Sequence, residues 1–221
     1  MTPPSPPSDR ARVRRIPERA RYDAEAIRAI VDAAYVCHVA FVDDSGVHCI
    51  PTACWREADQ LYVHGSNGSR MLKALSGGGE ACVTITHVDG LVLARSAFNH
   101  SMNYRSLVVH GRFELVPPEE KAASLDRFLD HLAPGRHREV RPGNRNELAA
   151  TSVLRIPLAE SSAKIRSGGP EDDEADLALD VWAGELPIAQ RREPPRPDGA
   201  RVPPPDYVRA WKDEPPPDPA A

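Results

Sequence analysis

The chain has 221 residues, of which 41% are hydrophobic, and its formal net charge is −4. This length is enough for one domain with a sizeable core. The negative charge gives no general attraction to nucleic acid or to anionic membranes, and no apolar run is long enough to span a bilayer. Because the N-terminus also lacks the apolar core of a signal peptide, we expect a cytoplasmic protein without a nucleic-acid or membrane partner.

Both ends of the chain are rich in proline and polar residues. Segments of this composition bury too little apolar surface to offset the entropy that they lose on ordering. We therefore predict a disordered Pro/Arg-rich tail over 1–19, a folded domain over 20–190 and a disordered Pro-rich tail over 191–221.

The four cysteines, Cys37, Cys49, Cys54 and Cys82, lie in apolar, strand-like runs and form no CxxC pair. This pattern predicts reduced thiols within the core of an intracellular protein. The eight histidines are scattered, and none belongs to an HxxxH or HExxH motif, so the sequence predicts no metal centre.

The first predicted element is a helix that Asp23 caps. Its apolar face is formed by Ile27, Ile30, Val31 and Ala34. The short apolar runs that follow it predict five strands, over 36–42, 47–55, 60–65, 81–86 and 90–98. Between the last two, the Asp89-Gly90 pair predicts a reversal of the chain.

The segment 104–116 shows the clearest alternation of apolar and polar side chains, and Gly111 within it indicates a bulge or a bend. A helix with an apolar stripe is predicted over 117–135, and late strands over 151–158 and 162–168. Many short strands with tight connections and few helices favour a mainly β (α+β) fold, in which an antiparallel sheet closes into a barrel.

One motif lies in HGSNGSRMLKAL, residues 64–75, where a strand runs through small residues into a helix. The first turn of such a helix leaves N–H groups unpaired, and these favour an anion. Ser66 and Ser69 add hydroxyl donors, while Arg70 offers a forked contact and Lys73 a point charge. We interpret this motif as a phosphate cradle. The same local pattern is equally consistent with a capped surface helix whose cations point into water.

A second polar cluster precedes the clearest strand. It comprises Arg95, Asn99, His100, Ser101, Asn103, Tyr104 and Arg105. A histidine and a tyrosine among so many polar side chains indicate a ligand surface, with a solvated loop as the alternative. A serine hydrolase is not supported, because the chain has no GxSxG elbow.

Four stretches in this order, LYVHGSNGSRMLKAL, THVDGLVLARSAFNHSMNYRSLVVHG, SSAKIRSGGPEDD and VWAGELPI, resemble the pyridoxamine 5′-phosphate oxidase-related flavin-nucleotide-binding proteins. These proteins belong to the FMN-binding split-barrel superfamily, which includes the nitroimidazole-resistance proteins. The resemblance extends from about Ile16 to Ile188. It implies a six-stranded antiparallel FMN-binding split barrel with flanking helices, and a homodimer with FMN at the subunit interface.

The resemblance also implies which residues contact the cofactor. Those residues are Ile50, Pro51, Thr52, Ala53, His64, Gly65, Ser66, Ser69, Arg70, Lys73, Asn103, Arg105 and Trp182. Among them, Ser69, Arg70 and Lys73 would hold the phosphate, and the strand 50–53 would lie along the flavin ring. Trp182 would reach the site across the dimer.

The implied activity is that of an FMN-dependent oxidoreductase, which passes electrons to a small organic acceptor or to oxygen, with His64 or Tyr104 as proton donor. True pyridoxamine phosphate oxidases end in a substrate-binding tail with an arginine and a histidine, whereas this chain ends in a proline-rich stretch. The resemblance therefore argues for the flavin and against pyridoxamine phosphate as the substrate. The alternatives are a non-catalytic flavin-binding or storage protein, and a split barrel that holds haem or the deazaflavin F420.

Overall fold

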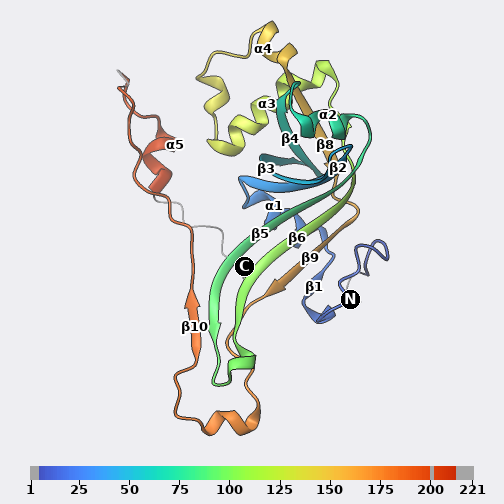
Figure 1. The fold of residues 1–221 in the computed structure, drawn as a ribbon. Coiled ribbons are helices and arrows are strands. Elements are labelled where there is room, and N and C mark those ends of the chain that lie inside the picture. Colours follow the sequence, from blue (N-terminus) through green and yellow to red (C-terminus); the bar gives the residue numbers. More distant parts are fainter. Residues whose placement is uncertain (1–4, 200–201, 213–221) are drawn as a thin grey trace.

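The structure is a computed structural model, and it describes residues 5–199 and 202–212. At its centre an antiparallel sheet curls into a half-open barrel, with helices around one end and a long arm at the other (Figure 1). The strands are β1 (Ala20–Arg21), β2 (Val36–Asp43), β3 (Gly46–Glu57), β4 (Gln60–Ser66), β5 (Glu80–Leu93), β6 (Ser101–Arg112), β7 (Glu114–Leu115), β8 (Thr151–Pro157), β9 (Ser161–Arg166) and β10 (Gly184–Pro187).

The sheet order is β1-β9-β6-β5-β2-β3-β4-β8-β7, and β10 adds to it by pairing with β5. This arrangement confirms the mainly β split barrel with flanking helices. The described residues form ten strands instead of six, because short edge strands and β10 extend the sheet.

The α-helices are α1 (Ala24–Asp32), α2 (Arg70–Ser76), α3 (Pro118–Leu132), α4 (Arg145–Ala150) and α5 (Asp206–Arg209). The 3-10 helices are η1 (Pro17–Arg19), η2 (Ala97–Asn99), η3 (Arg136–Arg138), η4 (Glu174–Ala178) and η5 (Ala210–Lys212). The predicted start of α1 is confirmed, since the Asp23 side chain accepts a hydrogen bond from the Ala26 N–H at 2.9 Å.

The barrel interior holds one continuous apolar core. Alternate residues of β2 and β6 point into it, and Val39, Phe41, Leu107 and Val109 are almost fully buried. A second, smaller cluster lies between the sheet and α3. It consists of Trp55, Tyr62, Val116 and Val153, with Leu125 and Phe128 packed against them.

The prediction of a chain reversal at Asp89-Gly90 was wrong. The structure has one long strand, β5, and the pair causes only a shift of register between Val88 and Gly90. A Cβ on Gly90 would lie 3.1 Å from the Leu186 carbonyl oxygen of β10, so the glycine permits close strand pairing. The chain reverses only after Leu93, around η2.

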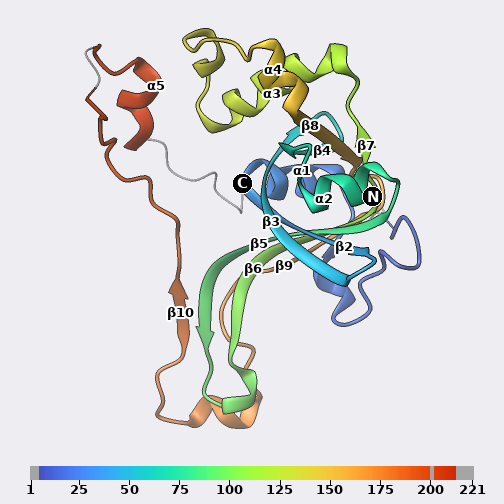
Figure 2. The same cartoon turned by 45° about the horizontal axis from the view of Figure 1, so that its top comes forward.

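We use the term arm for the far part of the β5–β6 hairpin, residues 88–103, together with the segment 170–188 that returns beside it as β10. Figures 1 and 2 show the arm extending away from the barrel, on the side opposite α2.

Residues in both predicted tails make contacts with the rest of the chain. The Arg10 guanidinium contacts carboxylate oxygens of Glu80 at 3.1 Å and Glu160 at 2.5 Å, and the Tyr207 hydroxyl donates to Glu139 at 2.7 Å. The disorder assigned to 1–19 and 191–221 stays a prediction, as do the domain boundaries. Residues 1–4, 200–201 and 213–221, which belong to these predicted tails, lie outside the described residues.

Candidate functional site

The cradle motif forms the strand, turn and helix that its sequence predicts. β4 ends at Ser66 and α2 begins at Arg70, with the Ser69 side chain accepting from the Leu72 N–H at 3.5 Å. A Cβ on Gly65 would lie 3.4 Å from the Leu72 side chain, so the glycine allows α2 to pack closely on the strand. The turn itself is fixed by Asn67, whose amide donates to the Ala149 carbonyl at 2.7 Å.

Two cations lie exposed at this turn. The Arg70 side chain is 61% exposed, and its nearest carboxylate oxygen, on Asp43, lies 3.8 Å away, beyond hydrogen-bonding distance. Lys73 is also exposed, and within the described ranges no hydrogen bond or ion pair engages its side chain. The donors of both side chains are therefore available to an anion.

Asp43, which the sequence analysis did not single out, lies at the tip of the β2–β3 hairpin beside Arg70. Its Oδ1 accepts hydrogen bonds from the Ser45 N–H at 2.8 Å and the Ser45 hydroxyl at 2.6 Å, and His48 Nε2 lies 2.9 Å away. These contacts, the Ser45 hydroxyl first, lower the pKa of Asp43 to about 2. The hairpin therefore presents a fixed, ionised carboxylate whose second oxygen faces Arg70.

The strand segment 50–53 lies in the middle of β3, away from the hairpin tip that carries Asp43. Ile50 pairs with Val39 and exposed Pro51 pairs with His38. Four or five residues of strand separate these pairs from the tip, which corresponds to ~13–17 Å.

His64 does not point toward Arg70. Its ring packs against Phe128 of α3, with centroids 4.5 Å apart, and lies 5.7 Å from the ring of Trp55. Burial lowers the pKa of His64, so the imidazole is neutral at pH 7. Its Nδ1 is buried and has no hydrogen-bond partner among the described residues.

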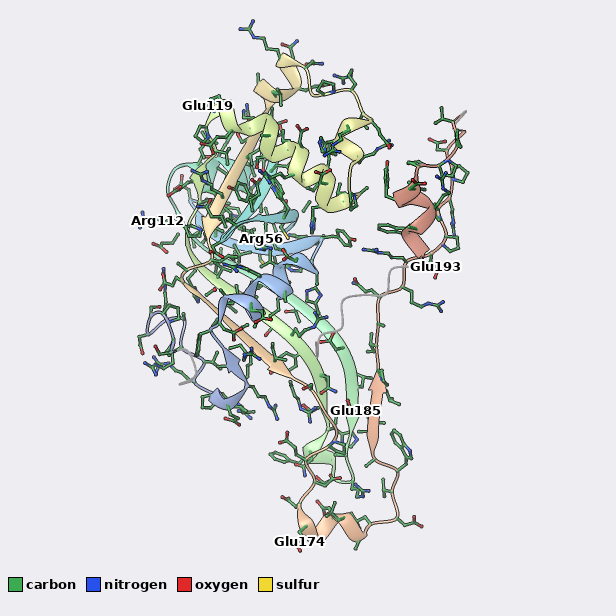
Figure 3. All side chains as sticks on the ribbon, turned by 180° about the vertical axis from the view of Figure 1, so that it is seen from behind. Arg56, Arg112, Glu119, Glu174, Glu185 and Glu193 are labelled. Atoms are coloured by element: carbon green, nitrogen blue, oxygen red, sulfur yellow. The ribbon has the colours of Figure 1, made fainter. Side chains whose placement is uncertain are left out.

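Two of the predicted cofactor contacts at the arm end of the barrel, Asn103 and Arg105, are engaged by the chain itself. The buried Asn103 amide donates to Glu185 Oε2 at 2.6 Å, and Figure 3 labels Glu185 on the arm. Arg105 donates to both carboxylate oxygens of Asp89, at 2.8 and 3.0 Å. Trp182 is 63% exposed.

One copy of the chain does not bring all predicted residues together. Ser66, Ser69, Arg70 and Lys73 form one group at the turn from β4 into α2. Asn103, Tyr104, Arg105 and Trp182 lie toward the arm at the opposite side of the barrel (Figures 1 and 2). Within one copy of the chain, the arm residues therefore do not join the cradle.

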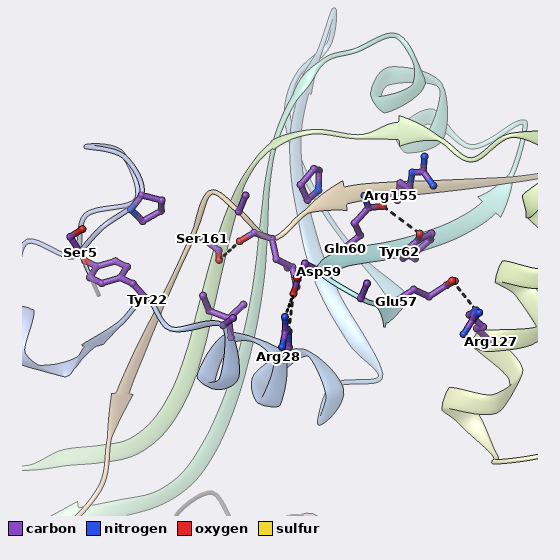
Figure 4. Close-up of a pocket in the computed structure, with 17 residues that line it drawn as sticks. Ser5, Tyr22, Arg28, Glu57, Asp59, Gln60, Tyr62, Arg127, Arg155 and Ser161 are labelled. Carbon is purple, nitrogen blue, oxygen red and sulfur yellow. Dashed lines mark hydrogen bonds and ion pairs between the residues drawn. The ribbon is translucent and has the colours of Figure 1, made fainter. Parts of the chain in front are cut away.

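A cavity of about 870 Å³ lies elsewhere, between α1, the β3–β4 turn, α3 and the β8–β9 turn (Figure 4). It contains none of the predicted cofactor residues. Its three arginines already contact carboxylates, in the pairs Arg28–Asp59 at 2.7 Å, Arg127–Glu57 at 2.9 Å and Arg155–Glu120 at 3.0 Å. Its charges are thus largely compensated, unlike those of the cradle.

The cysteines are unpaired, and only Cys37 and Cys54 are fully buried. The prediction of a core position was wrong for Cys49, which is exposed on β3 because its side chain points away from the barrel interior.

Within residues 5–199 and 202–212, no three His, Cys, Asp or Glu side chains are grouped in a way that could hold a metal ion. Helices in these ranges are too short or too polar to cross a membrane.

Comparisons with known proteins identify the relatives of this fold. Residues 23–165 match the family described as Pyridoxamine 5'-phosphate oxidase. The flavocytochrome Anf3 from Azotobacter vinelandii is 42% identical, with a TM-score of 0.90 over 94% of this chain and 99% of that chain. An FAD and heme binding protein from Mycobacterium smegmatis is 35% identical, with a TM-score of 0.84 over 88% of this chain and 97% of that chain.

A more distant structure, from Bacteroides thetaiotaomicron and named for 5-nitroimidazole antibiotic resistance, is 22% identical, with a TM-score of 0.55 over 66% of this chain and 86% of that chain. It shows the shared fold alone. Among curated proteins no match is found.

The curled antiparallel sheet and the strand–turn–helix motif at its end define a split-barrel protein. The chain belongs to the pyridoxamine 5′-phosphate oxidase family, as the resemblance of its four sequence stretches indicated.

Proposed function

We propose that the protein is a flavin-dependent oxidoreductase in which Ser66, Ser69, Arg70 and Lys73 hold the phosphate of a flavin nucleotide. The observation that carries this proposal is the pair of exposed cations with available donors, beside small residues that let a ligand approach the backbone. FMN is the nucleotide that the family resemblance implied, whereas the FAD and heme binding relative is named for FAD. The flavin supplies the redox chemistry when bound, and the protein binds and orients it.

The strand 50–53 is the proposed surface for the flavin ring. Pro51 is exposed there, and its neighbours in the strand are partly buried, so the strand offers a shallow, mostly apolar contact. Tyr104 is the proposed proton donor to a small-molecule substrate, because the other predicted donor, His64, is neutral and packs against Phe128. Since Tyr104 lies toward the arm, it would act on a flavin that a second copy holds.

The arm supports a homodimer. Large apolar side chains on it are exposed to solvent. Exposed apolar patches on soluble proteins usually mark an interface. These large apolar side chains are Val88, Leu91, Phe98, Met102, Leu177, Leu179, Val181, Trp182, Leu186 and Ile188. A twofold-symmetric pair would cover these side chains and bring each arm to the other copy's cradle. We place this dimer in the cytoplasm, without a nucleic-acid or membrane partner.

An absorbance spectrum of the freshly purified protein, with mass analysis of the compound that heat releases, tests the cofactor. We expect flavin bands and a mass that matches FMN or FAD. Steady-state oxidation of NADH or NADPH by the loaded protein then tests the activity. Turnover that requires the flavin supports an oxidoreductase. A flavin that no nicotinamide donor reduces would contradict this activity and leave a flavin-binding or storage protein.

Haem is a second candidate cofactor, and His64 favours it. A neutral, partly buried imidazole beside aromatic rings would be able to hold the iron of a haem. The two most similar structures reported above are named as a flavocytochrome and as an FAD and heme binding protein. The Nδ1 atom is buried, which leaves Nε2 as the atom that would ligate.

Reconstitution with haemin tests this second candidate. The wild-type protein is expected to give a Soret band that His64→Ala abolishes, while the control His110→Ala, on β6, retains it. An unchanged band in His64→Ala would exclude His64 as the ligand.

A further inference from the structure

The charge at the cradle is smaller than its two cations suggest. Arg70 and Lys73 contribute two positive charges, but the Asp43 carboxylate faces Arg70 at 3.8 Å. Three hydrogen-bonding contacts to Ser45 and His48 hold that carboxylate in place, so it does not turn away from a bound anion. The side chains around the turn therefore present a net charge of about +1 to a ligand.

The two flavin nucleotides differ in the charge that they bring to such a site. A phosphate monoester such as that of FMN carries about −1.5 to −2 at pH 7. Each phosphate in the pyrophosphate of FAD is a diester-type group with a single negative charge. A fixed carboxylate beside the binding arginine repels the monoester more strongly than the diester-type group, because repulsion scales with the product of the charges.

The surroundings of Arg70 also leave space for a longer ligand. Its side chain is 61% exposed, and the turn before it is open to solvent at Ser66, Asn67 and Gly68. A phosphate bound there is not enclosed, so a second phosphate and an adenosine can continue outward.

We infer that Asp43 is a specificity-determining residue, which shifts the selectivity of the cradle away from the terminal phosphate of FMN and toward the diester-type phosphate of FAD. This inference rests on the proposed function. Asp43 repels the ligand phosphate by its charge and lies beside Arg70. Ser45 and His48 contribute indirectly, because their contacts hold Asp43 in place.

Dissociation constants of FAD, FMN and riboflavin at about pH 7.5, for wild type, Asp43→Asn and Asp44→Asn, test the inference. We expect Asp43→Asn to reduce the preference for FAD over FMN by roughly five- to tenfold, mainly by tightening FMN. Asp44 carries the same charge one residue further along the hairpin and makes no contact with Arg70, so Asp44→Asn is expected to keep the wild-type ratio. Riboflavin has no phosphate, and its affinity is expected to stay constant.

Asp43 also stabilises the hairpin, so a second variant and a second measurement guard against a folding effect. Asp43→Ser retains an acceptor for the Ser45 N–H and is expected to shift the ratio as Asp43→Asn does. In wild type, lowering the pH from about 7.5 to about 5 removes the second charge of FMN and is expected to lower the ratio. His48 and Arg70 are the titratable groups that contact Asp43 from β3 and α2.

The outcomes separate the two proposals. A ratio that neither Asp43 variant changes, or that Asp44→Asn changes equally, would overturn the inference alone. A wild-type protein that binds no flavin nucleotide would overturn the proposed function and the inference with it.

Discussion

At the α2 end of the barrel, the side chains of Arg70 and Lys73 are exposed and make no hydrogen bond within the described chain. Where the barrel meets the arm, Arg166 is 4% exposed, and its guanidinium donates to the Asn103 side chain and to the carbonyls of Gly168 and Gly169. The same residue type thus serves two purposes. Arg166 satisfies acceptors of its own chain, and Arg70 keeps its donors available.

The apolar side chains of α2 and of the arm differ in the opposite sense. Met71 and Leu72 of α2 are buried, whereas Leu91 and Leu186 of the arm are more than 40% exposed. A small anionic ligand therefore fits the cradle, and a large apolar partner fits the arm. This contrast supports a site assembled from two copies, with phosphate contacts from one and arm contacts from the other.

The largest effect is expected from Arg166→Ala, where the barrel meets the arm. The change removes three hydrogen bonds and leaves the Asn103 oxygen without its donor, so we expect a loss of about 2–4 kcal/mol in unfolding free energy. Denaturant unfolding measures the loss. Arg70→Ala, the matched exposed arginine, is expected to change stability by less than about 0.5 kcal/mol. Equal losses in the two variants would contradict the contrast between the two regions.

Arg70→Ala is expected to weaken flavin nucleotide binding instead. Loss of a charged, forked phosphate contact costs about 2 kcal/mol, or roughly a 30-fold rise in Kd. Fluorescence titration measures it, with Arg28→Ala as a control, because Arg28 pairs with Asp59 at the cavity, away from the cradle. Unchanged nucleotide affinity in Arg70→Ala would remove the phosphate assignment.

A charge placed on the arm is expected to act on assembly alone. Leu91→Asp puts a carboxylate into the exposed apolar patch, and we expect the dimer Kd to rise by roughly tenfold. Light scattering over a dilution series measures this change. Leu115→Asp adds the same charge at an exposed site on β7 and serves as the control. A monomeric wild-type protein would refute this prediction outright.

The smallest effect concerns the pH dependence at the hairpin tip. Because hydrogen bonds lower the pKa of Asp43 from 3.8 to about 2, its charged form stabilises the fold above about pH 4. That contribution is lost as the pH falls through about 2. The stability difference between wild type and Asp43→Asn should therefore be largest near pH 5 and shrink toward pH 2. Thermal unfolding at several pH values checks this, and a difference that grows on acidification would show that another group dominates.

Local sequence patterns predicted much of the barrel. Asp23 caps α1 as expected, and the turn from Ser66 to Arg70 forms because its small residues and its serine cap are local signals. Asp89-Gly90 misled the prediction because the same pair suits a turn and a bulge, and only the pairing of β5 with β10 decides between them.

The environment of the cradle was beyond the reach of sequence patterns. Asp43 and Arg70 are 27 positions apart, and nothing in DDSG indicates which helix the hairpin will approach. The family resemblance likewise implied a place near the flavin for His64, but its packing against Phe128 depends on where α3 crosses the sheet. Such neighbours are set by tertiary contacts, for which a single sequence carries no periodic signal.

The most direct test of the account is the affinity of the wild-type protein for riboflavin compared with its affinity for FMN and FAD under identical conditions. The three ligands share the flavin ring, so the comparison isolates the phosphate. If the cradle holds phosphate, at least one nucleotide binds roughly 30-fold or more tightly than riboflavin. Equal affinity for all three would show that Arg70 and Lys73 belong to a solvated helix surface, and would contradict the proposed site.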